Sequence, residues 1–443
     1  MATETLGATI VIDLGLDRGE PETYAAPTRP TYPRWLAPLV IAVIVLVALG
    51  SSAPPPAPAL TRLLSLPVSA ADSYTVTDSG QLLAQSLGTL RSYDLSTGRL
   101  DWQSGTTGPA YRLRTSGGGV VLLRPWVYGA GQPSTVALAE ATGAPRWRRT
   151  GSVVTIVGSS ALLAVSSTRS LIGTGRRVQG PVSSIDAWTG VARWSIPVPS
   201  TAVLLGVPAA AGRPARLLLV HDDRTMALHD IDTGRLVAGT SLPAADYEPG
   251  NPTVSGGLIV LRHPAPGSWQ SEISAYDPVT LARRWVIPAQ GAYEATPCGP
   301  LTCLIGPNGV RAVDSATGAE RWYRPGWQTV EPRGNLMLVY ASPTGAADPV
   351  GLIDPRTGRV LVNLRGWRPL AGQGDGDGRV LVTRDIDGGT RTMVAVAVPG
   401  TAEPRPLADL PPGTGECQTA SDRLICRSDA GQLNVWAYRQ LSG

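Results

Sequence analysis

Asp314-Ser-Ala-Thr317-Gly318-Ala-Glu-Arg-Trp322 is the clearest copy of a phrase that recurs seven times along this chain. The phrase consists of an aspartate, two variable residues, Thr-Gly, three more residues and a tryptophan. Two other full copies are Asp94-Leu-Ser-Thr97-Gly98 with Trp102 and Asp186-Ala-Trp-Thr189-Gly190 with Trp194, and weaker copies centre on Thr142, Thr233, Thr280 and Thr357. Successive threonines lie about 37 to 47 residues apart, which is the period of a four-stranded propeller blade.

The phrase predicts a hairpin between the two outer strands of each blade. The segments 89–94 and 309–314, which precede two of the copies, alternate apolar and polar residues as strands do. Asp and Thr side chains can accept hydrogen bonds from the N–H groups of a tight turn, and Gly supplies the positive φ that closes it. The tryptophan then lies on the outgoing strand, where its ring can pack between neighbouring sheets.

Four copies depart from the phrase. Ala139 replaces the aspartate of the second copy, which keeps Trp147, and Leu281 replaces the glycine of the fifth, which keeps Trp285. Ala238 and Val362 replace the tryptophan of the fourth and seventh copies. We interpret these departures as decay of a structural repeat, and we assign the repeat residues to the scaffold instead of to a site.

The composition fits one large β domain with a weakly basic surface. Apolar residues make up 43% of the 443 residues, and 51 Gly and 40 Pro suit an architecture rich in turns. The net charge is +4, and the positive surplus is expected to be spread thinly. The densest basic stretch, Arg146-Trp-Arg-Arg149, is interpreted as one blade edge, so no nucleic-acid partner is expected.

An uncharged segment near the amino end predicts a membrane anchor. Residues 35–53 contain no charge and would span about 28 Å as a helix, close to the thickness of a hydrocarbon core. Arg29 and Arg34 flank its amino side, so residues 1–34 are expected to be a mostly disordered cytoplasmic tail. Residues 54–61 are then a Pro/Ala-rich linker, and residues 62–441 are an extracytoplasmic propeller at the plasma membrane. A cleaved signal peptide is the alternative, which Pro54 after Ser51-Ser-Ala53 disfavours.

Four cysteines occur in two close pairs, and this pattern favours disulfides in an oxidising compartment. Cys298 is expected to pair with Cys303, and Cys417 with Cys426, at matching places in two blades. A zinc site is the alternative, but the spacings are not Cys-x2-Cys and no histidine accompanies them.

The segments Ser184–Trp194 and Ala312–Trp322 resemble the tryptophan-docking repeat of the pyrroloquinoline quinone (PQQ)-like propellers, and the similarity covers roughly residues 62–441. The resemblance implies an all-β propeller, and we expect eight four-stranded blades within a range of seven to nine. Seven units carry the phrase, an eighth runs from Trp367 to Leu410, and residues 416–440 supply three more strands. A strand near residues 63–68 is expected to complete the last sheet and close the ring.

The family includes quinoprotein dehydrogenases, which use PQQ with calcium, and outer-membrane assembly scaffolds. This chain has no adjacent cysteines of the kind that often cover the quinone, and no catalytic or calcium-binding position can be matched. The best candidate metal loop, Gly372–Gly378 with Asp385 and Asp387, has only two oxygens at calcium spacing and is interpreted as a hairpin. His221, His229 and His263 are assigned to structure.

We therefore expect a non-enzymatic, membrane-tethered binding or scaffold propeller with no cofactor. Its expected partner is a protein of the cell envelope, and a glycan or peptide of the envelope is the alternative ligand. A PQQ-dependent oxidoreductase is the first alternative. The second is a transmembrane sensor whose tail, with its apolar and acidic residues 10–20, docks a partner inside the cell.

Overall fold

The structure is a computed structural model that describes residues 33, 35–50, 59–70, 72–86, 88–105, 110–116, 118–125, 134–156, 159–170, 175–209, 214–243, 252–342, 349–372, 378–420 and 422–438. The chain forms two compact units, Met1–Ala57 and Pro58–Gly443. In the first unit, helix α1 (Leu36–Gly50) lies within the segment expected to be the anchor. Among the described residues, no helix combines the length and the apolar character needed to cross a bilayer. Almost all of the expected tail and most of the linker lie outside the described residues.

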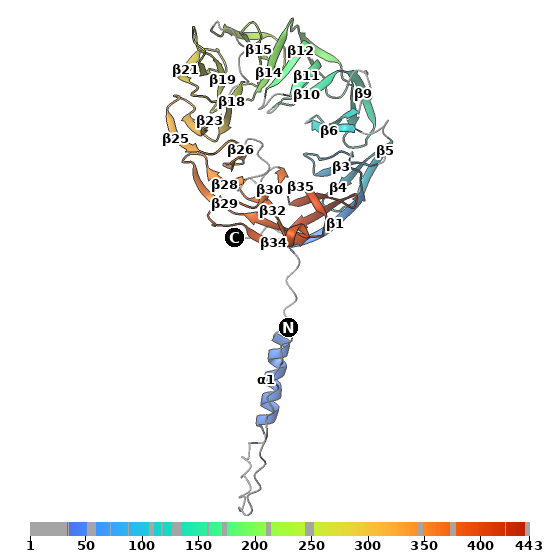
Figure 1. The fold of residues 1–443 in the computed structure, drawn as a ribbon. Helices are drawn as coiled ribbons and strands as arrows, with labels where there is room; N and C mark the ends of the chain where they lie inside the picture. The colour runs from blue at the N-terminus through green and yellow to red at the C-terminus, as the bar shows by residue number, and fades with distance from the viewer. Residues whose placement is uncertain are drawn as a thin grey trace, which may run out of the picture. The chain divides into compact units, whose positions relative to one another are not determined.

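The second unit is a succession of antiparallel four-stranded meanders arranged in a ring (Figure 1), which we number in chain order. The strands of meanders 1 to 4 are β2 Tyr74–Val76, β3 Gln81–Ser86, β4 Thr89–Asp94 and β5 Leu100–Gly105; β6 Ala110–Ser116, β7 Val120–Pro125, β8 Ser134–Ala139 and β9 Pro145–Thr150; β10 Ser152–Thr155, β11 Leu162–Ser170, β12 Arg176–Ile185 and β13 Ala192–Ile196; β14 Thr201–Val207, β15 Arg216–His221, β16 Thr225–Asp230 and β17 Leu236–Ser241.

The strands of meanders 5 to 8 are β18 Thr253–Ser255, β19 Leu258–Pro264, β20 Ser271–Tyr276 and β21 Arg283–Pro288; β22 Glu294–Cys298, β23 Leu301–Gly306, β24 Gly309–Asp314 and β25 Glu320–Pro325; β26 Thr329–Arg333, β27 Leu336–Tyr340, β28 Pro349–Asp354 and β29 Arg359–Asn363; β30 Arg368–Pro369, β32 Val380–Ile386, β33 Arg391–Ala397 and β34 Arg405–Leu410. A single 3₁₀ turn, Asp387–Gly389, joins β32 to β33 in this part of the described chain.

The ring closes by pairing the first strand of the unit with its last strands. Meander 9 consists of β35 Thr414–Ala420, β36 Arg423–Ser428 and β37 Gln432–Tyr438, with β1 Leu60–Pro67 as its outer strand. Strand β1 pairs antiparallel with β37, from Leu60 opposite Tyr438 to Pro67 opposite Gln432. The expected closure by an amino-terminal strand is therefore confirmed. The short strand β31 Ala371–Gly372 adds to the inner edge of this sheet by parallel pairing with β35.

Meanders 3 and 4 share one eight-stranded sheet, because the first half of β12 pairs with β14 while its second half pairs with β13. Counted as continuous sheets, the described strands form eight sheets. Counted as meanders, the same strands form nine units, and eight blades stays a prediction between these two ways of counting.

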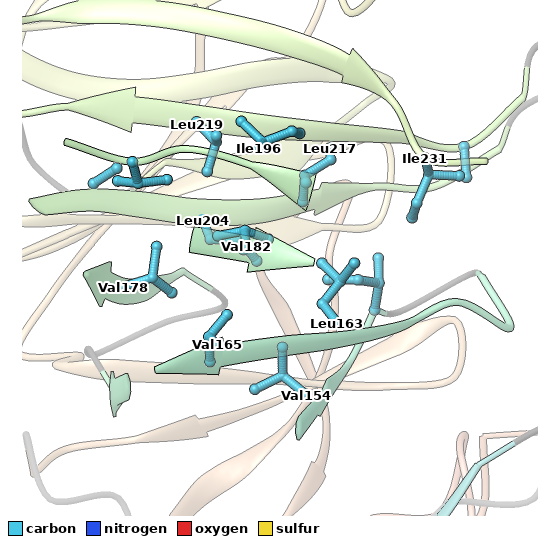
Figure 2. Packing of buried hydrophobic residues seen from close by; sticks show 14 residues of the cluster. Val154, Leu163, Val165, Val178, Val182, Ile196, Leu204, Leu217, Leu219 and Ile231 are labelled. Carbon is cyan, nitrogen blue, oxygen red and sulfur yellow. The ribbon is translucent and has the colours of Figure 1, made fainter. Parts of the chain in front are cut away.

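The core lies between successive meanders. In β15, Leu217 and Leu219 pack with meander 3, whereas Leu218 and Val220 pack with meander 5, as the alternation of side chains along a strand requires. Figure 2 shows the first of these clusters, with Val154, Leu163 and Val165 of meander 3 beneath the leucines of meander 4. Leu66 of β1 packs with Leu82 of meander 1, which continues the core across the closure. Each sheet therefore contributes both of its faces to stability.

Candidate binding surface

The aspartate and glycine of the repeat build the hairpin turn. The Oδ1 atom of Asp186 accepts hydrogen bonds from the N–H groups of Trp188 at 3.0 Å and Thr189 at 2.8 Å. Gly190 closes the turn with a φ of 69°, and its N–H donates to the Asp186 carbonyl at 2.8 Å. The same two Oδ1 bonds form in four other copies, at Asp94, Asp230, Asp277 and Asp314. In the seventh copy, Asp354 Oδ1 accepts the first of them, from the Arg356 N–H at 2.9 Å.

Each of the five repeat tryptophans docks on the turn of the next meander. Trp147 Nε1 donates to the carbonyl of Ala187, the residue after the next repeat aspartate, at 2.8 Å. The corresponding carbonyl accepts the indole N–H in four further pairs: Trp102 with Glu140, Trp194 with Ile231, Trp285 with Ser315, and Trp322 with Pro355. The repeat tryptophans are thus fastened to the neighbouring sheet and not to a ligand.

The turn requires glycine for a second reason besides its positive φ: the docked indole ring lies directly against it. A Cβ built on Gly143 would stand 2.4 Å from Cε3 and Cζ3 of Trp102, and one on Gly190 would stand 2.7 Å from Cγ of Trp147. Nonbonded carbon atoms do not approach one another this closely. A side chain at these positions would therefore expel the tryptophan of the preceding meander.

An arginine directly before the tryptophan neutralises the repeat aspartate in three meanders. Arg284 donates to Asp277 at 2.5 Å, and Arg193–Asp186 and Arg321–Asp314 pairs form at 2.6 Å. The hydrogen bond from Arg284 is the largest of the causes that lower the pKa of Asp277, which falls to about 2. These carboxylates are committed to the turns, so they are poor candidates for a catalytic base.

The departures at Ala238 and Leu281 compensate one another. Meander 4 has Ala238 in place of the docking tryptophan, and the turn that would receive that ring has Leu281 in place of glycine. Leu281 keeps the left-handed backbone, with a φ of 56°, and is 2% exposed in the cluster that also contains Leu228 and Ala238. Leu281 and Ala238 thus belong to one apolar cluster, which favours mutual compensation over decay at these two positions.

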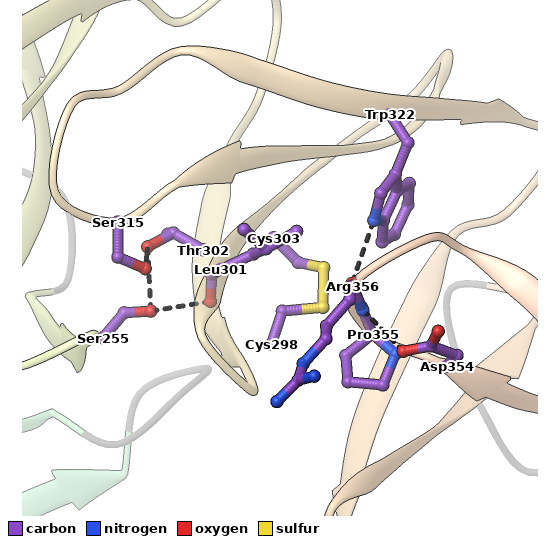
Figure 3. Close-up of a disulfide and its surroundings, with 10 residues drawn as sticks. All are labelled: Ser255, Cys298, Leu301, Thr302, Cys303, Ser315, Trp322, Asp354, Pro355 and Arg356. Carbon is purple, nitrogen blue, oxygen red and sulfur yellow. Dashed lines mark hydrogen bonds between the residues drawn. A yellow bond between two sulfur atoms is a disulfide. The ribbon is translucent and has the colours of Figure 1, made fainter.

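Both expected disulfides form, and each joins the first two strands of its meander. Cys298 of β22 bonds Cys303 of β23 in meander 6, and Cys417 of β35 bonds Cys426 of β36 in meander 9. Figure 3 shows the first bridge beside Thr302, whose hydroxyl lies in a buried chain of hydrogen bonds with Ser255 and Ser315. The bridges lie inside the sheets and tie hairpins.

These bridges do not fit the quinone site that the family resemblance implies. The cysteines are five and nine residues apart and link neighbouring strands, so they form no ring of adjacent cysteines over a cofactor. Of the candidate loop, residues 373–377 lie outside the described residues, and Asp385 accepts a hydrogen bond from Arg368. Across the described ranges, no three His, Cys, Asp or Glu side chains are grouped as a metal would require.

The three histidines are separate structural groups. His263 is 1% exposed, and its ring nitrogens meet the Pro264 carbonyl at 2.8 Å and Ser274 Oγ at 2.7 Å. His229 Nδ1 lies 3.0 Å from the Gly234 carbonyl of the repeat turn. Burial is the main cause that lowers the pKa of His221, which therefore favours the neutral imidazole.

In the described part of the propeller, two tryptophans outside the docking position are exposed, and neither was predicted from the sequence to be functional. Trp269 is 88% exposed in the β19–β20 hairpin, and Trp188 is 45% exposed in the repeat turn of meander 3. The hairpin of Trp269 is closed by a bond from Ala265 N–H to the Gln270 carbonyl at 2.9 Å. The sequence signal that could have found them is their position, since neither stands four residues after the glycine of a Thr-Gly pair.

A family model described as outer membrane protein assembly factor BamB matches residues 64–285, half of the chain. The chain belongs to the PQQ-like β-propeller family. No curated protein matches the sequence. Among solved structures, the chain is similar to BamB from Moraxella catarrhalis, with 17% identity, a TM-score of 0.42, and coverage of 86% of this chain and 100% of that chain.

Two other solved structures are also similar to the chain. A eukaryotic initiation factor has 10% identity and a TM-score of 0.52, over 84% of this chain and 90% of that one. Quinohemoprotein alcohol dehydrogenase from Pseudomonas putida HK5 has 12% identity and a TM-score of 0.36, over 64% of this chain and 71% of that one. Identities this low speak to the fold alone.

Proposed function

We propose that this protein is a non-enzymatic binding scaffold whose partner is another protein of the cell envelope. The observation that carries the proposal is the exposure of Trp188 and Trp269 on ordered turns of the propeller. Tryptophan offers a large apolar area with little conformational entropy to lose, and it is the residue most enriched at the energetic centres of protein interfaces. Two such side chains left in water on folded turns favour docking of a partner.

The contacts of the repeat residues support this assignment, because they already give those residues a structural role. Its aspartates bind turn N–H groups and arginines, its tryptophans bind the next meander, and its glycines lie under those rings. The recurring polar groups are thus used in assembling the ring. What differs between meanders is the connecting turns, and binding residues are commonly found on turns held by a rigid scaffold.

The tether and the location form the second part of the proposal. The nineteen uncharged residues 35–53 and the arginines before them favour a single membrane anchor with the amino end in the cytoplasm. Disulfides Cys298–Cys303 and Cys417–Cys426 favour an oxidising, extracytoplasmic compartment for the propeller. Extraction of membranes with alkaline carbonate tests the tether: the full chain should stay in the pellet, and a variant without residues 35–53 should be released. Release of both would contradict it.

A photocrosslinking residue at position 269 tests the scaffold assignment in the cells that make the protein. We expect one discrete adduct with an envelope protein, and none from the same residue at Val360, which is 42% exposed on the outer strand β29. A lack of adducts at both position 269 and position 188 would remove the assignment.

Titration of the purified full chain with PQQ and calcium tests the enzymatic alternative. Stoichiometric quinone absorbance together with dye-linked oxidation of an alcohol or sugar would overturn the non-enzymatic reading. We expect neither, because the cysteine bridges are committed to hairpins and the repeat carboxylates to turns.

A further inference from the structure

The positive charge of the propeller is concentrated in two adjacent meanders. Residues 106–199, which contain meanders 2 and 3, have ten arginines and two acidic residues, Glu140 and Asp186, for a net charge of +8. The rest of the chain has 38 − 10 = 28 arginines against 34 − 2 = 32 acidic residues, or −4. The expectation of a thinly spread surplus is therefore wrong. One sector of the ring is strongly basic, and the other meanders taken together are not.

An unusual contact between the two meanders lies in this sector. The arginine before the docking tryptophan pairs with the repeat aspartate in meanders 3, 5 and 6, but in meander 2 the aspartate is replaced by Ala139. Arg146 instead lies over the ring of Trp188 in the next turn, with Cζ 3.4 Å from the ring centroid. At the same place in the turn, the other six copies have Ser96, Ala141, Asp232, Val279, Ala316 and Arg356. The arginine that lacks its aspartate partner in meander 2 thus contacts a tryptophan of meander 3 that no other copy has at this position.

The surroundings of this contact form an exposed basic and apolar surface. Arg146 and Arg148 of β9 are exposed, Trp188 is 45% exposed, and Val191 is 64% exposed. Arg149 braces the turn, since its Nη1 donates to the Gly190 carbonyl at 2.9 Å. We call Arg146, Arg148, Trp188 and Val191 the platform.

We propose that the platform docks an acidic segment of a partner protein that also carries apolar side chains. This inference rests on the scaffold function and names the chemistry of its partner. Arg and Trp are the side chains most enriched at interface hot spots, and a local charge of this sign attracts and orients an acidic partner. Trp188 and Val191 add apolar area that a purely ionic ligand would leave in water.

A structural explanation of the arginines accounts for only half of the platform. Charged residues on an outer strand such as β9 discourage edge-to-edge association of sheets. Trp188 and Val191 have the opposite effect, because they add exposed apolar surface beside the same edge. The combination therefore favours recognition.

The test measures fluorescence anisotropy of labelled peptides with the full-length protein in detergent micelles. The acidic probe repeats Asp-Leu-Glu-Val, and the neutral probe repeats Asn-Leu-Gln-Val. We expect the acidic probe to bind at least about tenfold more tightly, and its binding to weaken as salt rises, since exposed charges are screened. Trp188→Ala and Arg146→Gln should each weaken it about tenfold, the loss typical of one hot-spot side chain.

Matched controls separate recognition from damage to the fold. Arg321→Gln changes the equivalent arginine of meander 6 and should leave binding unchanged, and Trp188→Phe should keep most of it. Equal binding of both probes, or full binding by Trp188→Ala and Arg146→Gln, would overturn the inference. So would preferential, Arg146-dependent binding of vesicles of phosphatidylcholine with one-fifth phosphatidylglycerol, or of duplex DNA.

The outcome is distinguishable from failure of the scaffold assignment. If the acidic probe does not bind while position 269 still captures an envelope protein, the inference fails and the scaffold stands. If neither position 188 nor position 269 captures a protein, the scaffold assignment fails first.

Discussion

Replacement of Gly143 by alanine tests whether the docked tryptophan, and not only the turn, requires glycine. Gly143 has a φ of 68°, and a Cβ there would stand 2.4 Å from two ring atoms of Trp102. Gly119 in the same meander has a φ of 69°, and a Cβ there would meet nothing within 4 Å. The two substitutions therefore share the backbone strain and differ in the clash alone.

The strain of a left-handed alanine is about 1 kcal/mol, so Gly119→Ala should lower the free energy of unfolding by about that amount. Gly143→Ala must also displace the indole ring, which costs about 1–3 kcal/mol of overpacking. It should further break the 2.9 Å bond from Trp102 Nε1 to the Glu140 carbonyl, for about another 1 kcal/mol. We expect a total loss of about 3–5 kcal/mol for Gly143→Ala.

Urea unfolding followed by circular dichroism measures both variants, together with Trp102→Ala and the double variant. Trp102→Ala should cost about 3–5 kcal/mol by itself. In the double variant the clash is gone, so the combined loss should fall short of the sum of the single losses by about 2 kcal/mol or more. Additive losses, or equal losses for Gly143→Ala and Gly119→Ala, would refute the docking argument.

Three further predictions concern the other features of the repeat and the closure. Leu281→Gly should open a cavity and lower the free energy of unfolding by about 2–4 kcal/mol. Adding Ala238→Trp should recover part of this loss in the same urea assay. No recovery would contradict the reciprocal packing. Because the pKa of Asp277 is lowered to about 2, its stabilising contribution is complete above about pH 4 and is lost as the pH falls toward 2. Arg284→Gln should therefore reduce the drop in melting temperature between about pH 4 and about pH 2. An unchanged drop would contradict the pairing of Arg284 with Asp277. Cys426→Ser should cost about 2–3 kcal/mol on loss of the bridge to Cys417, and a melting temperature equal to that of the unmodified chain would show that the bridge contributes nothing.

The fold could be predicted from the sequence because a local signal repeats at a fixed period. A turn that needs Gly318 and an anchor that needs Trp322 are short-range requirements, so they survive in a single sequence. The cysteine spacings likewise predicted a bridge within each pair, and in the structure Cys417 and Cys426 oppose each other in paired strands.

What could not be predicted is the set of contacts between residues of different meanders. Leu281 looked like a lost glycine because the ring it replaces belongs to position 238, in the preceding meander. Arg146 looked like one member of a basic run because its partner, Trp188, comes from the next one. Each of these departures from the repeat is explained by a residue of a neighbouring meander, and these contacts exist only in the folded ring.

The pairing of β1 with β37 determines when the ring can close during synthesis. Of the described strands of the ring, β1 is synthesised first, whereas its partner β37 is synthesised last. The first strand of the ring must therefore wait, unpaired, until nearly the whole domain has been produced. A chain that stops between residues 411 and 431 has meanders 1 to 8 but lacks β37, the strand with which β1 pairs. Closure of the ring thus requires that translation has passed β37.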